Sequence, residues 1–507
     1  MGNVIPPLRS HRGLIRRKAV AFKHFAVIGV IGTVAVASVA CSAVGVAHAA
    51  PTGGSSDWPA GSPSEWLNGL LSDLPSGSSS GSSTGHGQSV LATDGQRKLE
   101  ALARQILGTE VVRDQITQVQ ALYAADPRGS TPAGKATIDR AANSIAAAAV
   151  QYGLSENPDD PVLMWAITAP HEFSGLSMPR SGYGIENPDN VYRQATVAGD
   201  ASYEIRGKIT APGPVELHFE LRDAVPGTTV LNNEAGKTIG ALSSDQITVG
   251  ADGSFVVTVD SKPADGRRNH LPIPAETTSF LVVRDLLNDW SRENPVQLDI
   301  TRVSGPPIAA PKSVDQLAER SAEILSKMAP YWLSYFNQYL YAAAPANVFS
   351  PVRARPGGRG LSTNGWFDLA DDQALVATVD PVGAKSLGIQ ITDPWGVAYE
   401  YRDHTSSLNT TQSKPNPDGT YTFVISKNDP GVFNWLDPEG HGSGMLAVRW
   451  QAMTGTPTLE SAVREVKVVK ADQLRQALSP ATIFVNPGER AAQQRERAAN
   501  FDRRMTG

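Results

Sequence analysis

The densest group of residues that could do chemistry lies in one short stretch toward the C-terminal end of the sequence. Its members are Asp429, Asn434, Trp435, Asp437, His441 and Arg449. Two carboxylates, an imidazole, an amide and a guanidinium could bind a sugar or a carboxylated ligand. They could also perform general acid–base catalysis if the carboxylates flanked a bond. These six residues form the predicted site, with either a binding or a catalytic role.

A structural interpretation of the same residues remains open. Asp429 and Asp437 each precede a proline, which is typical of turns, while the amide and the indole can serve as a loop cap and as core filling. Arg449 lies in a stretch that is apolar on both strand faces, so a buried guanidinium there would need one of these two carboxylates as its partner. His441 lies between two glycines and has little to pack against, which favours a ligand-binding role for it.

The familiar catalytic motifs give little support for an enzyme class. The pattern GxSxG occurs only in the Gly/Ser-rich stretch 77–85, where no strand and helix flank it as a nucleophile elbow requires. The metalloprotease HExxH, the dinucleotide-binding GxGxxG and the P-loop pattern do not occur. The sequence therefore predicts no metal and no cofactor, and it leaves open whether the protein is an enzyme.

Residues 1–49 have the organisation of a secretory signal peptide. A basic stretch precedes the apolar run 25–46, and Ala47-His48-Ala49 then places small residues at both positions that signal peptidase reads. We expect cleavage after Ala49, by the general or the twin-arginine export route, and a secreted or envelope-associated protein. The alternatives are an uncleaved membrane anchor and lipidation at Cys41, the only cysteine.

Cleavage would leave an acidic chain. Six of the 45 Lys and Arg residues lie in the signal segment, whereas all 50 Asp and Glu residues lie beyond it. The mature protein would thus lack the basic footprint of a nucleic-acid-binding protein. It would also have no transmembrane span and, without Cys41, no disulfide.

The remaining sequence divides into helical and β-rich stretches. Apolar positions spaced by three and four residues predict helices, whereas strict alternation predicts strands. We expect a Gly/Ser/Pro-rich linker over 50–92, a helical hairpin over 94–155, a first β-sandwich-like unit over 160–305, a helical connector over 313–345, a second β-sandwich-like unit over 362–470 and a polar helical tail over 471–507. The predicted fold class is α+β, with two antiparallel β-sandwich or jelly-roll-like units and accompanying helices.

Two of these elements have sides of different character. In the stretch 215–222 apolar residues alternate with polar ones, which predicts an antiparallel strand with one solvent-exposed face. In the helix over 313–344, Tyr331, Tyr335 and Tyr339 recur every four residues. Such a stripe could be a ligand platform, but we expect it to be the packed face of the helix.

The two β-rich stretches share a pattern of turn, amide and guanidinium. In the first, the turn at Asp252 precedes Asn269 by 17 residues, and Arg284 follows after a further 15. In the second, the turn at Asp418 precedes Asn434 by 16 residues, and Arg449 follows after a further 15. The similar offsets predict a duplicated unit in which Asn269 corresponds to Asn434 and Arg284 to Arg449.

Several stretches resemble a bacterial family. Residues 187–192, 203–207, 429–437 and 440–441 are similar to the family known as domain of unknown function twelve-fourteen, which has exported actinobacterial relatives. The similarity extends over roughly 160–470 and includes both β units. This resemblance implies a β-sandwich or jelly-roll fold with helices beside the sheets, and it implies no established activity.

Three functions are compatible with an exported protein of this kind. The first is the binding of a polar or glycan-like ligand at the cell envelope, with an envelope glycan or lipid as the partner. The second is a secreted hydrolase that uses Asp437 or Asp429 with His441. The third is a non-catalytic envelope scaffold. Two carboxylates about 5–10 Å apart in an open cleft would favour the hydrolase.

The export hypothesis predicts where the mature protein begins. N-terminal sequencing of protein recovered from the medium or the envelope should start at Ala50 or a neighbouring residue, because the small residues that define the cleavage position end at Ala49. A chain that still starts at Met1 and stays in the membrane fraction would contradict this prediction.

Overall fold

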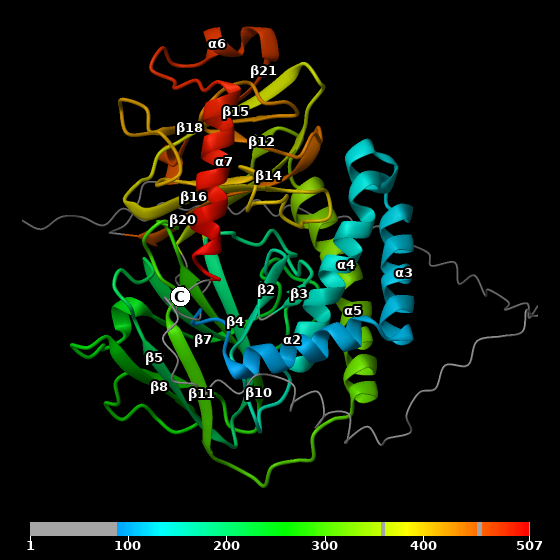
Figure 1. The fold of residues 1–507 in the computed structure, drawn as a ribbon, viewed down its shortest axis with the longest axis vertical. Coiled ribbons are helices and arrows are strands. Elements are labelled where there is room, and N and C mark those ends of the chain that lie inside the picture. The colour runs from blue at the N-terminus through cyan, green and yellow to red at the C-terminus, as the bar shows by residue number, and fades with distance from the viewer. Residues whose placement is uncertain (1–88, 174, 356–359, 454–458, 506–507) are drawn as a thin grey trace, which may run out of the picture. The chain divides into compact units, whose positions relative to one another are not determined.

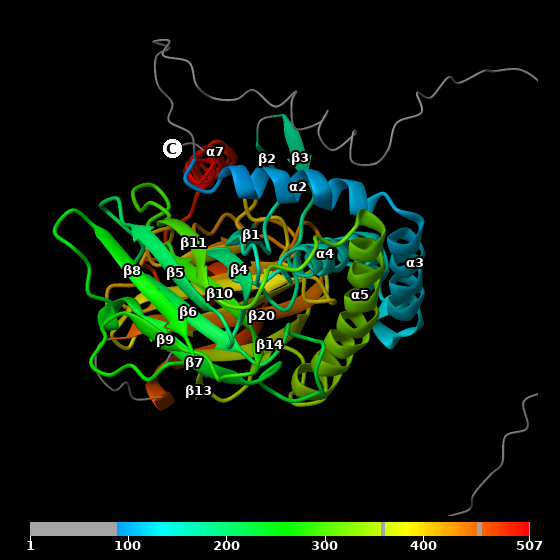
Figure 2. The ribbon, with the colours of Figure 1, turned by 90° about the horizontal axis from the view of Figure 1, so that it is seen from below.

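The computed structural model describes residues 89–173, 175–355, 360–453 and 459–505. Two pairs of β-sheets lie beside a group of helices that gathers on one side of the sheets (Figures 1 and 2). This arrangement confirms the α+β class with antiparallel sheets. The predicted signal peptide, Cys41 and the predicted linker up to residue 88 lie outside the described residues. In the described ranges no helix combines the length and the apolar character that crossing a bilayer requires.

The first pair of sheets forms a sandwich from residues 164–304. One sheet has the antiparallel order β1 (Met164–Ala166), β4 (Asn190–Ala198), β10 (Thr278–Leu286), β6 (Glu216–Arg222) and β7 (Thr238–Ser243). The other has the order β11 (Gln297–Ser304), β5 (Ser202–Lys208), β8 (Ser254–Asp260) and β9 (His270–Pro272). Apolar residues of both sheets, such as Phe219, Val257 and Leu281, form the core between them. A separate small hairpin pairs β2 (His171–Phe173) with β3 (Leu176–Met178).

The second pair of sheets forms a sandwich from residues 348–470. One sheet has the order β12 (Val348–Phe349), β14 (Leu361–Asp368), β20 (Ser443–Met453), β16 (Ala384–Thr392) and β17 (Ser407–Asn409), and β13 (Arg353–Ala354) also pairs with β14. The other has the order β19 (Trp435–Leu436), β18 (Tyr421–Ser426), β15 (Gln373–Val379) and β21 (Val463–Lys470). Phe367, Ile389 and Trp450 are among the buried residues of its core.

The two sandwiches follow the same strand order. The central strand β10 lies between β4 and β6, as β20 lies between β14 and β16, and each sandwich has one short strand that pairs in parallel, β9 with β8 and β19 with β18. Asn269 and Asn434 precede these short strands. Each exchanges two hydrogen bonds of 2.7 or 2.8 Å with the backbone of one loop residue, Thr248 or Lys414. The same strand order thus accompanies the similar offsets in the sequence.

The polar face of β6 is buried, although its alternating sequence predicts a solvent-exposed face. The strand itself is where the sequence predicts it, yet His218, Glu220 and Arg222 are all buried. Glu220 accepts hydrogen bonds from Arg222 and Thr238, so the charges of this face are compensated inside the protein. Alternation identifies the two faces of a strand, but it does not show whether the polar face contacts solvent or another polar surface of the protein.

The helices before and after the first sandwich cover the sheet that contains β10, which is the inner sheet of this sandwich. The inner sheet of the second sandwich is the one that contains β20. Residues 94–155 hold three helices where a two-helix hairpin is predicted: α2 (Asp94–Leu107), α3 (Glu110–Ala125) and α4 (Pro132–Leu154), with the short turn η1 (Pro127–Ser130) before α4. The side chain of Thr131 caps α4, and Ser313 and Gln316 form a capping box at the start of α5 (Val314–Phe336). Residues of α4 and α5 join Val282 of β10 and Ala447 of β20 in one apolar cluster.

The C-terminal helix α7 (Pro487–Asp502) is not the exposed tail that its polar sequence predicts. Arg490, Arg497 and Arg504 are buried. Arg490 pairs with Asp429 at 2.9 Å, Arg497 donates to the carbonyl of Tyr401 at 2.7 Å, and Arg504 donates to the carbonyl of Pro188 at 2.9 Å. The helix and the residues after it are therefore attached to the body by these arginines together with Phe501, which is buried in an apolar cluster with Trp290 and Tyr401. A short helix, α6 (Leu474–Ala477), precedes it.

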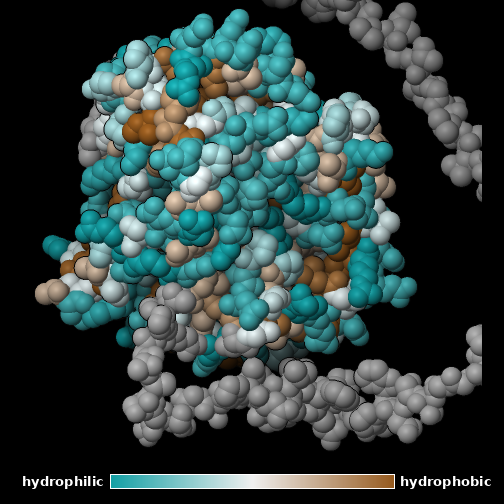
Figure 3. All heavy atoms as spheres, turned by 45° about the horizontal axis from the view of Figure 1, so that its top comes forward, coloured by the Kyte–Doolittle hydropathy of each residue, from teal (hydrophilic) through white to brown (hydrophobic). Residues whose placement is uncertain are grey.

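The face drawn in Figure 3 is largely hydrophilic, and its apolar residues come to the surface in a few separate groups. Isolated apolar residues of this kind are common on protein surfaces. The apolar groups of this face therefore do not by themselves indicate a docking surface.

The attachment of α7 can be tested at Arg490. Arg490→Ala leaves Asp429 without its partner, and removal of one member of a buried pair costs about 3–5 kcal/mol of folding free energy. Because Asp429 is one-third exposed, we expect a loss of about 3 kcal/mol in denaturant titration. Hydrogen exchange should also accelerate across 487–502. The matched control is Arg495→Ala on the same helix, since Arg495 is exposed. Equal stability of the two variants would contradict the attachment.

Candidate functional site

A cavity of about 340 Å³ lies where both sandwiches and α5 meet. This volume lies within the range of small-molecule sites. The polar and aromatic residues that line it are Tyr152, Tyr183, Glu186, Tyr192, Arg222, Asn233, Glu234, Arg284, Trp332, Tyr335, Tyr339, Arg353, Arg355, Ser362, Asn364 and Arg449. Asn233, Glu234 and Arg353 are exposed, so the cavity reaches solvent at this rim.

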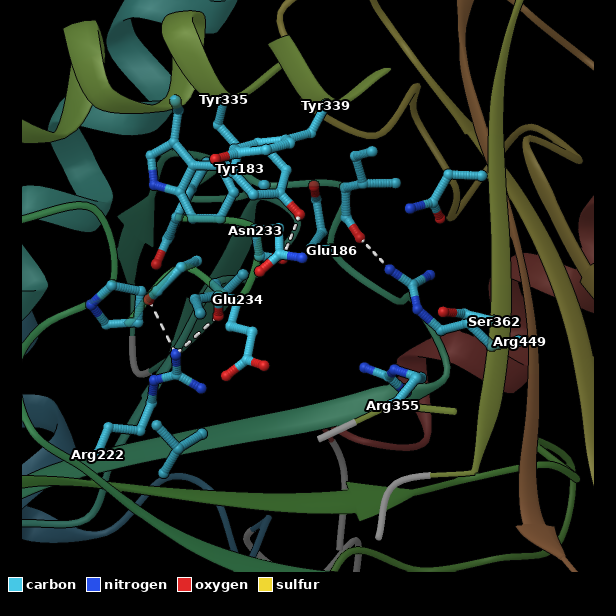
Figure 4. A pocket seen from close by; sticks show the side chains of 18 of the residues that line it. Tyr183, Glu186, Arg222, Asn233, Glu234, Tyr335, Tyr339, Arg355, Ser362 and Arg449 are labelled. Carbon is cyan, nitrogen blue, oxygen red and sulfur yellow. Dashed lines mark hydrogen bonds between the residues drawn. The ribbon is translucent and has the colours of Figure 1, made fainter. Parts of the chain in front are cut away.

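Aromatic rings from α5 form one wall of the cavity. Figure 4 shows Tyr335 and Tyr339 on one side, with Ser362 and Arg449 on the other. The ring centroids of the two tyrosines lie 5.2 Å apart, and Tyr339 belongs to a π-helical turn, η3 (Asn337–Tyr341), of a kind that is frequent at functional sites. Packing alone therefore does not account for the aromatic stripe: Trp332 is buried in the helix cluster, whereas the two tyrosines are half-buried at the cavity.

A buried carboxylate organises the arginines of the first sandwich. Glu220 accepts from Arg222 Nη1 at 2.8 Å and from Arg284 Nη1 at 2.6 Å. The second nitrogen of Arg222 donates to the carbonyls of Glu234 and Ala235, at 3.0 and 2.8 Å. This network fixes the guanidinium groups of Arg222 and Arg284 along one side of the cavity.

Among the described residues Arg449 has no carboxylate partner, and the prediction that Asp429 or Asp437 would pair with it is wrong. Its Nη2 donates to the carbonyl of Ile185, and its Nη1 is buried with no hydrogen-bond partner in the described part of the chain. The carboxylates of Glu186 and Asp189 act on it only from beyond ion-pair distance. Burial lowers the pKa of Arg449. Neither aspartate was available, because each has a different partner.

Glu186 is a buried carboxylate at the cavity. Its oxygens accept from the backbone N–H of Ala398 at 3.1 Å, and Arg180 Nη1 lies 4.0 Å away. Burial is the main reason that its pKa is raised to about 7. A carboxyl with a pKa near neutral pH can be protonated or ionised in the folded protein, depending on the charges around it.

The segment 185–189 joins the two sandwiches beside the cavity. The Asn187 side chain donates to Gln451 Oε1 at 2.9 Å, and Asp189 accepts from Asn409 Nδ2 at 2.8 Å. Ile185 has φ of 57°, a conformation that costs energy for a β-branched residue. This strained residue presents its carbonyl to Arg449. In the sequence, the segment 185–189 was indicated by the stretch 187–192, which resembles a known family. That stretch contains few residue types that suggest catalysis.

The predicted site residues other than Arg449 lie away from the cavity lining. Asp429 pairs with Arg490, and Asn434 bonds to the loop at Lys414. Trp435 is buried, and its Nε1 donates to the carbonyl of Ser426 at 3.0 Å. Asp429 thus holds the C-terminal helix α7, whereas Asn434 and Trp435 stabilise loops of the second sandwich.

Asp437 and His441 lie in one loop but have separate partners. Asp437 Oδ2 lies 2.7 Å from His404 Nδ1, and this hydrogen bond raises the pKa of His404. His441 stacks on Tyr399, with ring centroids 5.6 Å apart, and burial lowers its pKa. The imidazole next to Asp437 is thus His404, whereas the hydrolase hypothesis pairs this carboxylate with His441.

Acidic, histidine and cysteine side chains do not gather into a metal-binding group of three or more anywhere in the described ranges. The hydrogen-bond donors of the cavity are guanidinium, phenol, hydroxyl and amide groups, and its five arginines outnumber its two carboxylates, Glu186 and Glu234. Such donors suit polar organic ligands and anions better than cations.

Comparison with known proteins connects the first sandwich to a family. Residues 192–287 match the model of the family described as "Protein of unknown function (DUF1214)", as the resemblance implies for this stretch. The matched stretch includes Glu220, Arg222 and Arg284 of the cavity network. No curated protein matches the sequence.

One solved structure shows that the fold occurs elsewhere, and a second has a weaker similarity. An uncharacterised protein from Burkholderia cenocepacia is 22% identical and has a TM-score of 0.56, with coverage of 73% of this chain and 99% of its own. The VPA0106 protein from Vibrio parahaemolyticus is 11% identical with a TM-score of 0.33, and the match covers 56% of this chain and 90% of that protein. The first similarity concerns the fold alone.

The raised pKa of Glu186 predicts a pH-dependent stability. Its value of about 7 lies above the ordinary 4.5, so the folded protein holds this proton more tightly than the unfolded chain. The resulting stabilisation is complete below pH 4.5 and is lost as the pH rises through 7. Glu186→Gln cannot ionise, so its melting temperature should exceed that of the wild type at pH 8 by an amount equivalent to roughly 3 kcal/mol, and the difference should vanish near pH 4.5.

The matched control for this pH profile is Glu172→Gln, since Glu172 is exposed. Its melting temperature should follow the wild type throughout. If the melting temperatures of the wild type and Glu186→Gln changed with pH in parallel, Glu186 would have the same pKa in the folded and the unfolded chain. That result would contradict the prediction.

Proposed function

We propose that this chain binds a polar, ring-containing ligand of glycan-like character in the cavity between its two sandwiches. One observation carries the proposal: the aromatic wall of Tyr335 and Tyr339 faces a wall of guanidinium, hydroxyl and amide groups across a cavity that reaches solvent. Sugars and similar rings use both kinds of contact, with one face against an aromatic ring and hydroxyl groups toward polar side chains.

The proposed place of action is the cell envelope. The basic and apolar order of residues 1–49 and the cleavage pattern Ala47-His48-Ala49 support export. A polar ligand at the envelope, either a glycan or the head group of a lipid, is the partner that such a location favours.

We also infer that residues 362–470 are a second copy of the family's β unit. The support is the common strand order, the common parallel pairing of β9 and β19, and the identical hydrogen bonds of Asn269 and Asn434. In this interpretation the cavity lies between the inner sheets of two related units.

The proposed binding can be tested by thermal shift with the mature protein and a panel of envelope sugars. A ligand at 100 times its Kd should stabilise the fold by about 2.7 kcal/mol. Tyr335→Ala should abolish the shift, because it removes one of the two tyrosine rings of the aromatic wall. Tyr421→Ala is the control, since Tyr421 is a similarly half-buried ring in the second sandwich, away from the cavity. A shift that persists in Tyr335→Ala and disappears in Tyr421→Ala would exclude this cavity as the site.

A further inference from the structure

Two arginines of the cavity occupy equivalent strand positions but have different partners. Arg284 lies on the central strand β10 and donates from Nη1 to Glu220 Oε2 at 2.6 Å. Arg449 lies on the central strand β20 and donates only to a backbone carbonyl, that of Ile185. Its Nη1 is buried without a hydrogen-bond partner in the described ranges. One of the two guanidinium groups is therefore compensated and the other is not.

The strand register explains the difference. Glu220 of β6 is opposite Val282, two residues before Arg284. In the second sandwich the residue opposite Ala447, two residues before Arg449, is Gln390 of β16. Gln390 is buried and neutral. The second sandwich thus has the arginine but lacks the carboxylate that accompanies it in the first.

A guanidinium nitrogen that is buried without a hydrogen-bond partner or a counter-charge is costly. Arg504 also has such nitrogens in the described ranges, but it and the other buried arginines each have a carboxylate or an aromatic ring beside them. Arg193 pairs with Asp285 at 2.9 Å. Arg497 and Arg504 lie over the ring of Trp290, at 4.5 and 4.4 Å from its centroid. Arg449 has no such partner in the described chain, yet it faces a cavity that can admit one. A ligand that brings a negative charge would remove the cost.

We propose that the ligand carries an oxyanion group, such as a carboxylate, sulfate or phosphate, that binds between Arg449 and Arg284 while its ring lies against Tyr335. Planar guanidinium groups bind such oxygens through two parallel N–H···O bonds. An acidic sugar is the simplest ligand that satisfies both walls. This assignment rests on the proposed function of the cavity and adds the charge of the ligand to it.

The charge requirement can be tested with sodium D-glucuronate, D-glucose and sodium sulfate as probes at constant ionic strength. Thermal shift of the mature protein should be largest with glucuronate and smallest with glucose, which has the same ring without the carboxylate. A larger response to sulfate than to glucuronate would instead identify a tetrahedral oxyanion. Arg449→Met should raise the melting temperature of the free protein, because it removes an uncompensated buried charge, and it should abolish the response to glucuronate.

A second variant restores the missing carboxylate from inside the protein. Gln390→Glu places an acid where the first sandwich has Glu220, so it should also raise the melting temperature and abolish the glucuronate response while Arg449 is retained. Arg206→Met is the control, since the Arg206 side chain is 66% exposed. This control should change neither quantity.

Several outcomes would overturn the oxyanion proposal. It fails if no anion raises the melting temperature of the wild type more than that of Arg449→Met. A sulfate effect that is equal in both proteins would be such a failure. It also fails if Gln390→Glu responds to glucuronate as the wild type does. A response to glucose that Tyr335→Ala abolishes and Arg449→Met preserves would overturn the charge requirement and leave the proposed function intact.

Discussion

The charged faces of β6 and β10 lie at the junction of the two sandwiches, where a charge has little access to solvent and needs a partner inside the protein. Glu220 meets this demand for the first sandwich by accepting from both Arg222 and Arg284. Because a buried charge that loses its partner is strongly destabilising, these contacts also fix the distance between strands and loops. The form of the cavity therefore follows from charge pairing as much as from apolar packing.

The segment 185–189 extends this constraint to the second sandwich. It offers a carbonyl to Arg449, an amide to Gln451 and a carboxylate to Asn409. Gly388 is part of the same fit, because a Cβ at this position would lie 2.8 Å from Asp189 Oδ2. Each sandwich supplies hydrogen-bond partners for buried groups of the other. The two sandwiches must therefore form their junction together. The strained Ile185 lies at the centre of this junction, where surrounding contacts can hold an unfavourable backbone conformation.

Local patterns in the sequence predict the elements of this protein better than they predict its contacts. Alternation places the strand β6, and equal offsets place Asn269 and Asn434 at equivalent turns, because both signals depend on neighbours along the chain. The buried position of Arg449 Nη1 also follows from the apolar surroundings of this residue. Its lack of a carboxylate does not, because Asp429 is bound by Arg490 of a helix whose polar sequence predicts exposure. Contacts between segments distant in the sequence decide which charges are compensated, and composition does not report them.

The two inner sheets differ in the side chains that flank their central arginines. Tyr192 and His218 flank Arg284 on the neighbouring strands, whereas the residues that flank Arg449 are Ser362 and Gly388. Two similar backbone frames thus carry large side chains on one side of the junction and small ones on the other. Ser362 lines the cavity, whereas Gly388 makes room for Asp189, and this side lacks the carboxylate that Glu220 provides in the first sandwich. A cavity and an uncompensated guanidinium at one place would both be costs to a purely structural junction, but together they are what a site for an anionic ligand requires.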